Sequence, residues 1–248
     1  MDLGGFDTSK VTDVRMIFYK CSSLINLDLG NFNTSKVTDM GYMFRDCSSL
    51  ISLDLSNFNT SIVTTMDFMF SSCSSLTSLS LNNFNTSKVT SMSNMFNGCS
   101  SLMSLDLNNF NTSNVTDMGG MFGNCSSLTN LDLRSFNTSK VTTMHQMFRN
   151  CSAITSLDLN NFNTASVTDM SYMFSGCSKI KLYINVTSEN VSYDNMFGRD
   201  VLTGKYALSD PSSYAIIGYT TNTQSIAEAM KLTADSAYQS KVTLKQIV

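Results

Sequence analysis

Hydrophobic positions recur every 26 residues along most of the chain, and the polar positions between them recur with the same spacing. A fixed period of this length is typical of proteins in which similar units stack on one another. Two residue types mark the period most clearly: Phe6, Phe32, Phe58, Phe84, Phe110, Phe136 and Phe162, and Cys21, Cys47, Cys73, Cys99, Cys125, Cys151 and Cys177. Six full copies of the unit occupy residues 21–176.

The first part of each unit has the pattern of a short β-strand. In one copy Leu53 and Leu55 flank Asp54, so alternate side chains point to opposite sides of the strand. The leucines are expected to face the core and the aspartate to face solvent. The pattern therefore predicts one short strand in each unit.

The second part of each unit has helical spacing. Met66, Met69 and Phe70 fall on one face of a predicted helix, and Thr64 is placed to cap its first turn. Several units then close on residues that tolerate the left-handed conformation after a helix: Gly98, Asn124, Asn150 and Gly176. We therefore expect one or two helical turns in each unit.

A strand and a short helix cannot bury their apolar sides alone, but stacked copies can. The sequence thus predicts an α/β repeat solenoid with one short parallel strand and one short helix per 26-residue turn. We assign residues 1–197 to it, with a partial first rung and an irregular last rung. Residues 1–6 match the middle of the unit, so the chain is expected to start partway through a repeat.

The repeat decays toward the C-terminus. Residues 180–184 and 191–197 form an irregular eighth unit that is three residues shorter than the others, as suits a terminal rung. Residues 198–248 are predicted to form a small α+β cap, with strands at 214–219 and 241–248 and a helix at 224–232. A flexible tail that leads to another domain is the alternative.

The unit Cys-Ser-Ser-Leu-x-x-Leu-Asp-Leu-x-x-Phe-Asn-Thr-Ser-x-Val-Thr-Asp-Met-x-x-Met-Phe resembles the BspA-like branch of the leucine-rich repeats, over residues 1–197. The resemblance implies a leucine-rich-repeat solenoid, display on a cell surface, and adhesion to host proteins or neighbouring cells. Phe58 departs from common leucine-rich repeats, which place there an Asn or Cys that bonds to the backbone. Asn59 is expected to take over that task.

Composition narrows the function classes. The net charge of −3 and the charged fraction of 14% provide no basic field, so nucleic acid and acidic lipid are not expected partners. No apolar run is long enough to cross a bilayer, and no signal peptide is visible in the chain. No metal or cofactor motif, phosphate-binding loop or catalytic triad is evident, so an enzyme is not expected. A monomer is expected.

An exposed strand face is the candidate binding surface. Stacked carboxylates in one row either bind cations, pair with neighbouring groups or lie in solvent that screens them. The row of aspartates is interrupted by Ser80. The candidate residues are Asn26, Asp28, Ser52, Asp54, Ser78, Ser104, Asp106, Asn130, Asp132, Arg134, Ser156 and Asp158.

The cysteines and methionines are predicted to pack in the core rather than to bind metal ions or react. The cysteines lack the spacing of zinc ligands, and we expect a ladder of buried, reduced, inert thiols, although neighbouring rungs would allow disulfides by distance. The 17 methionines recur at helical spacing beside Phe, which favours packing over soft-metal binding. His145, the only histidine, is expected to face solvent.

Two further polar rows allow alternative functions. A flat row of threonines could bind ice or a crystalline polymer: Thr34, Thr60, Thr86, Thr112, Thr138 and Thr164. A second row has the acceptor pattern for N-glycosylation: Asn33, Asn59, Asn85, Asn111 and Asn137. We favour an extracellular or cell-surface module that binds a protein or glycan through the strand face. A structural spacer with no ligand of its own is the alternative.

Overall fold

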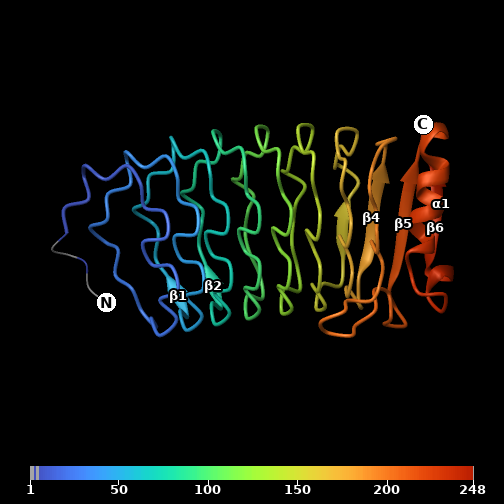
Figure 1. The fold of residues 1–248 in the computed structure, drawn as a ribbon, viewed down its shortest axis with the longest axis horizontal. Helices are drawn as coiled ribbons and strands as arrows, with labels where there is room; N and C mark the ends of the chain where they lie inside the picture. Colours follow the sequence, from blue (N-terminus) through green and yellow to red (C-terminus); the bar gives the residue numbers. More distant parts are fainter. Residues whose placement is uncertain (1–2, 4–5, 248) are drawn as a thin grey trace.

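The computed structural model describes residue 3 and residues 6–247, and it arranges them as one elongated stack (Figure 1). Each repeat forms one rung, a turn of chain that lies against the next rung. The rungs follow one another in sequence order, and the two last strands and a helix lie at the C-terminal end. The expectation for residues 1–6 depends on residues 1, 2, 4 and 5, which lie outside the described part.

Short parallel strands lie at the position that the alternating leucines predicted. β1 (Ser52–Leu53) pairs in parallel with β2 (Ser78–Leu79). An isolated parallel bridge joins Ser104 to Asn130 at the equivalent place in later rungs. β3 (Leu157–Leu159) begins a four-stranded parallel sheet. The partners are 26 residues apart, so the pairing register follows the sequence period.

A second column of parallel bridges runs along the other side of the rungs. It joins successive rungs through single residues, from Asp13 and Asp39 through Asp117 to Asp169 and Ser192. The sequence pattern did not predict this column, because one bridging residue per rung leaves no alternation to detect.

The predicted helix in each repeat is wrong. In its place the chain makes consecutive turns, and the only α-helix among the described residues is α1 (Gln224–Leu232). The N–H of Phe68 donates to Ser93 O at 2.9 Å in the next rung, and the N–H of Phe70 donates to Met95 O at 2.9 Å. Backbone groups that a helix would use within the repeat therefore join neighbouring rungs instead.

Left-handed residues are the physical reason for the missing helix. Phe68 has φ 56° and Ser72 has φ 60°, and equivalent positions are left-handed in the other rungs. Such a residue ends a right-handed helix. The left-handed conformation predicted at the end of the unit is confirmed at Gly98, Asn124, Asn150 and Gly176. Thr64 is not an N-cap, because its hydroxyl donates to Thr38 O at 3.1 Å in the preceding rung.

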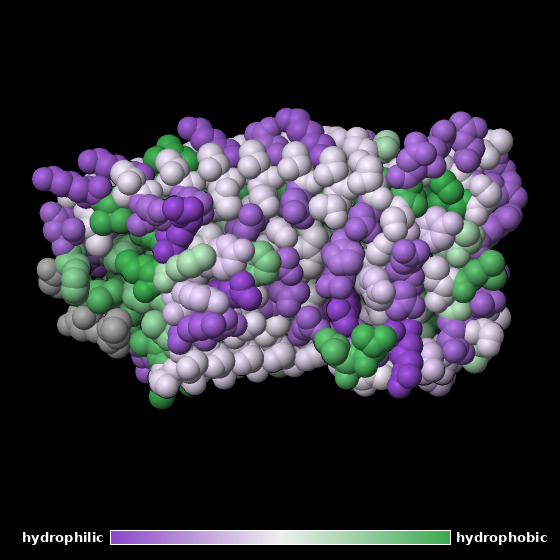
Figure 2. Space-filling model, viewed as in Figure 1, coloured by the Kyte–Doolittle hydropathy of each residue, from purple (hydrophilic) through white to green (hydrophobic). Residues whose placement is uncertain are grey.

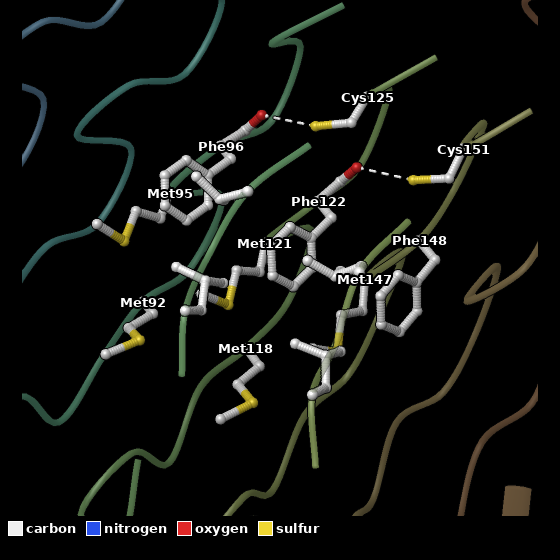
Figure 3. Packing of buried hydrophobic residues seen from close by; sticks show 14 of the residues in the cluster. Met92, Met95, Phe96, Met118, Met121, Phe122, Cys125, Met147, Phe148 and Cys151 are labelled. Carbon is white, nitrogen blue, oxygen red and sulfur yellow. Dashed lines mark hydrogen bonds between the residues drawn. The ribbon is translucent and has the colours of Figure 1, made fainter. Parts of the chain in front are cut away.

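The core is a set of side-chain columns that run along the stack. The rings of Phe70 and Phe96 lie 5.7 Å apart and nearly parallel, and those of Phe96 and Phe122 lie 5.8 Å apart. Figure 3 shows the buried methionines beside this column. The prediction that Met66, Met69 and Phe70 face the core is confirmed, even though turns rather than a helix carry them.

The cysteines form a second column, which runs along the stack beside the phenylalanine column. Six are buried and Cys21 is half-buried, and all seven are free thiols. The Cys125 thiol donates to Phe96 O at 3.1 Å and the Cys151 thiol to Phe122 O at 3.0 Å (Figure 3). Burial raises the pKa of the Cys125 thiol to about 12, which suppresses the reactive thiolate.

The threonine row is internal, so it cannot form the proposed ice-binding surface. Thr86 is buried, and its hydroxyl donates to Asn111 O at 3.0 Å and accepts the Asn111 N–H at 2.8 Å. The same two bonds join Thr60 to Asn85. Each threonine thus fastens its rung to the next through both polar backbone groups of one residue.

Asparagine side chains form a second polar ladder between rungs. The amide of Asn83 reaches Leu55 O at 2.9 Å and Phe58 O at 3.0 Å in the preceding rung. Asn59, the predicted residue for such bonding, instead accepts the Ser61 N–H at 3.1 Å within its own turn. The ladder therefore runs through the asparagine before the phenylalanine, not the one after it.

The C-terminal region extends the parallel sheet. β4 (Lys181–Val186), β5 (Tyr214–Tyr219) and β6 (Val242–Gln246) follow β3 in that order. The observed β5 and α1 coincide with the predicted strand and helix, and β6 lies inside the predicted strand at 241–248, whose last residue is not described. β4 pairs with β5 over six residues, and β5 pairs with β6 over five, so these strands continue the sheet that begins at β3.

Candidate binding face

The strand face consists of the outward positions of the strand column. Asp132 is half-buried, and the other eleven predicted residues are exposed. They follow one another from rung to rung, since Ser52 pairs with Ser78 and Ser104 with Asn130. The structure therefore brings the predicted residues together on one surface: Asn26, Asp28, Ser52, Asp54, Ser78, Ser104, Asp106, Asn130, Asp132, Arg134, Ser156 and Asp158.

Each aspartate of this face also shapes its own turn. Asp54 accepts the Ser56 N–H at 2.9 Å, and Asp106 accepts the Asn108 N–H at 3.0 Å. The backbone hydrogen bond from Ser56 lowers the pKa of Asp54. These bonds turn the chain directly after the strand, which keeps the strand short. Each of these aspartates therefore commits one carboxylate oxygen to the fold.

One place on the strand face carries an ion pair. Arg134 contacts Asp132 at 2.5 Å, and its hydrogen bonds lower the pKa of that carboxyl to about 2. A hollow of about 250 Å³ lies beside the pair and is also lined by Asn130, Ser156 and Asp158. Because Arg134 is 80% exposed, the pair is screened by water and adds little stability. It is available to a ligand.

Exposed apolar side chains flank this face, and the repeat pattern did not predict them. Ile25, Ile51 and Met103 are 53%, 48% and 59% exposed and occupy the same position of the repeat. These residues could have been recognised in the sequence, because each is an apolar residue directly after a core leucine, at a position where other repeats have Thr. These side chains add apolar contact area next to the polar face.

The turn face lies on the other side of the core. It consists of the two outward positions between the core methionines of each rung. Tyr42 and Phe68 stack at 4.7 Å on this face, and the Arg45 guanidinium lies 4.9 Å from the Phe68 ring. The sequence did not predict this surface, because the expected helix would have placed these residues on its solvent-exposed side.

His145 lies on the turn face and is only 40% exposed, so the expectation that it faces solvent is wrong in part. Its Nδ1 atom is buried without a hydrogen-bond partner and lies 3.6 Å from Asp169 Oδ2. Asp169 also accepts the Ser171 N–H at 2.8 Å. Among the described residues, no three His, Cys, Asp or Glu side chains converge as metal ligands would.

A buried ion pair joins the repeats to the C-terminal region, and sequence reasoning missed it. Arg149 donates to Asp200 at 2.5 Å across 51 residues of chain. Burial opposes ionisation of Asp200, but hydrogen bonds from Thr203 and Arg149 outweigh it and lower its pKa to about 2. Two residues so far apart in the sequence produce no local pattern from which their contact could be predicted.

The asparagines of the glycosylation pattern are exposed, and each accepts the N–H of the serine two residues on, as Asn85 does from Ser87 at 3.0 Å. Hydrophilic and near-neutral residues cover most of the face seen in Figure 2, and hydrophobic residues gather near the N-terminal end and in smaller patches toward the C-terminal end. In the described part of the chain, no helix has the length and apolar character needed to cross a bilayer.

The family described as Mycoplasma protein of unknown function, DUF285, matches the chain twice, over residues 1–105 and 99–201. The two matches overlap and cover most of the chain, so the chain belongs to this family. Their succession agrees with a repeat protein that has parallel strand pairing and few helices. No curated protein and no solved structure matches the chain.

Proposed function

We propose that this protein is an extracellular or cell-surface adhesion module that binds a protein or glycan of a host or a neighbouring cell. One observation carries the proposal: the polar residues of the strand face are exposed in register over consecutive rungs. A continuous surface of this kind suits an extended macromolecule, since repeat proteins recognise such ligands along their stacked units. The hollow of about 250 Å³ would add a local contact.

We further propose that the stack is a leucine-rich-repeat solenoid of the BspA-like kind. Parallel pairing at intervals of 26 residues and the phenylalanine column support this assignment. The turns with left-handed residues would replace the helix of common leucine-rich repeats. Display outside the cell follows from the same resemblance.

The experiment measures binding of the purified chain to a panel of matrix proteins and to a glycan array. Replacing Asp106, Asp132 and Asp158 together by Ser removes three carboxylates, and the fold already carries Ser80 in that row. Binding to any identified ligand is expected to weaken at least tenfold. The control replaces Asp13 and Asp39 by Thr, the residue of Thr65 and Thr143 in their column. Equal loss in both variants contradicts the proposal.

A spacer without a ligand is the second candidate. The hydrogen bonds that thread the stack, such as those from Thr86 to Asn111, would make a stiff connector. A spacer binds nothing on either panel, whereas the adhesion module binds at least one ligand. We propose no catalytic activity: among the described residues, the sole histidine contacts an aspartate and a tyrosine rather than a nucleophile.

A further inference from the structure

The repeats differ from one another mainly on the turn face. Core and ladder positions carry the same residue in nearly every rung, because stacking needs identical shapes. The two outward positions between the core methionines follow no such rule. They are Gly41-Tyr42, Asp67-Phe68, Ser93-Asn94, Gly119-Gly120, His145-Gln146 and Ser171-Tyr172. Variation within an otherwise uniform stack gives this face residues that a partner can distinguish.

A hollow of about 330 Å³ lies on the turn face where one rung carries two glycines. Gly119 and Gly120 form its floor, and Thr143, His145 and Gln146 of the next rung form one wall. Gly120 has φ +63°, and a Cβ atom there would lie 2.3 Å from Asn94 Oδ1. The Asn94 side chain therefore occupies the space that a Gly120 side chain would take, and the hollow lies between Ser93 and Asn94 of one rung and His145 and Gln146 of the other.

The walls of the hollow present acceptors and negative charge. Asp117 commits Oδ1 to the Gly119 N–H at 2.7 Å, and its other oxygen accepts no hydrogen bond from the described residues. Asp169 lies behind His145 at 3.6 Å. The hollow contains no Lys or Arg among the residues that line it. Burial raises the pKa of nearby Asp67, and the charge of Asp117 raises it further, which indicates a negative field along this column.

Two more polar residues of the next rung line this region. His145 Nδ1 is buried, makes no hydrogen bond and lies 3.6 Å from Asp169 Oδ2, so the imidazole forms a wall of the hollow with this atom turned toward Asp169. The Gln146 amide lines the hollow and makes no hydrogen bond within the described structure. A ligand with several N–H donors and a positive charge would bond to the Gln146 side chain and to the free oxygen of Asp117 together.

We propose that this hollow binds one basic side chain of a protein partner, the ammonium of a lysine or the guanidinium of an arginine. Asp117 supplies the countercharge, Thr143 and Gln146 supply acceptors for the remaining N–H groups, and His145 forms the wall beside them. The site lies across the core from the strand face, so the proposal goes beyond the proposed function and does not depend on it.

The test uses His145 as its own reporter, because it is the only histidine in the chain. The imidazole proton resonances are followed by NMR while the peptides Gly-Lys-Gly and Gly-Arg-Gly are added at constant pH. A saturable shift with a basic peptide, weakened by added salt, is expected. The peptide Gly-Glu-Gly should give no saturable shift. An equal response to the acidic peptide overturns the proposal.

Matched variants locate the response. The double variant G119S/G120N gives this rung the Ser93-Asn94 pair of an earlier rung, so it fills the hollow with residues that the fold already carries. It should abolish the saturable shift, and an unchanged shift overturns the proposal. Asp117→Ser follows Ser91 in the same column and should weaken peptide affinity roughly tenfold. If the double variant does not fold, Asp117→Ser alone tests the proposal. An unchanged affinity of this variant for the basic peptides would refute the site.

Discussion

The repeated rungs and the C-terminal region join neighbouring layers by different means. Strands in the rungs extend over two or three residues, and single backbone hydrogen bonds and side-chain ladders join the remaining parts of each rung to the next. In the C-terminal region, β4, β5 and β6 pair over five or six residues, and α1 packs against β5 and β6. A stack with short strands therefore depends on repeated side chains, whereas longer strands can join layers of irregular sequence.

The strongest test of this comparison removes a ring from the phenylalanine column. Phe96→Ala should lower the free energy of unfolding by about 4 kcal/mol, because it leaves a cavity between the rings of Phe70 and Phe122. Urea unfolding followed by circular dichroism measures the loss. The control Met103→Ala changes a side chain that is 59% exposed and should cost about 0.5 kcal/mol or less. Similar losses in both variants would show that the column is not the main support.

The buried ion pair tests how the two regions are joined. Asp200→Asn should cost about 3 kcal/mol, since Arg149 would keep a mostly buried, uncompensated charge. Acid should weaken the junction of the native protein. Because the folded pKa of Asp200 is lowered to about 2, its stabilisation is complete above about pH 4 and is lost as the pH falls toward 2.

Hydrogen exchange measures this effect within the native state. Amides of residues 199–206 should exchange faster in Asp200→Asn, while those of distant rungs stay protected. In that variant the acid-dependent loss between about pH 4 and pH 2 should shrink. Unchanged exchange at residues 199–206 would mean that the ion pair does not hold this segment.

The threonine ladder should matter less than the core column. Thr86→Val keeps the shape of the side chain but leaves the N–H and C=O of Asn111 without their partner, at a cost of about 2 kcal/mol. Thermal unfolding gives the loss. Thr77→Val is the matched control, because Thr77 is exposed and its hydroxyl lies 3.4 Å from Ile51 O. If both valines cost the same, the buried ladder has no special role.

The asparagine ladder should give the smallest change in the free energy of unfolding. It also allows one variant that lowers this free energy and another that raises it. Asn109 donates to Leu81 O and Phe84 O, while the equivalent position one rung later is Ser135. Asn109→Ser should cost about 1 kcal/mol, and Ser135→Asn should gain up to about 1 kcal/mol by completing the ladder. Urea midpoints of the two variants should therefore move in opposite directions. Movement of both midpoints in one direction would contradict the ladder.

Sequence periodicity was sufficient for the parts of the fold that repeat. The period placed Phe70 and Cys73 in buried columns and Leu53 in a parallel strand, because identical residues can be stacked in only one register. The exposed strand face followed from the same alternation. The helix failed because Met66, Met69 and Phe70 share an inward direction in consecutive turns as well as in a helix.

The sequence by itself determined the period, the residues of the core, the outward strand positions and the elements after residue 198. Only the tertiary structure decided that Thr86 fastens two rungs, that Arg149 meets Asp200, and that Gly119 and Gly120 leave a hollow beside His145. The division has a physical reason. The pattern of buried and exposed positions is the same in each repeat, so one repeat is enough to predict it. A hydrogen bond or a hollow between rungs forms only when segments that are distant in the sequence come together.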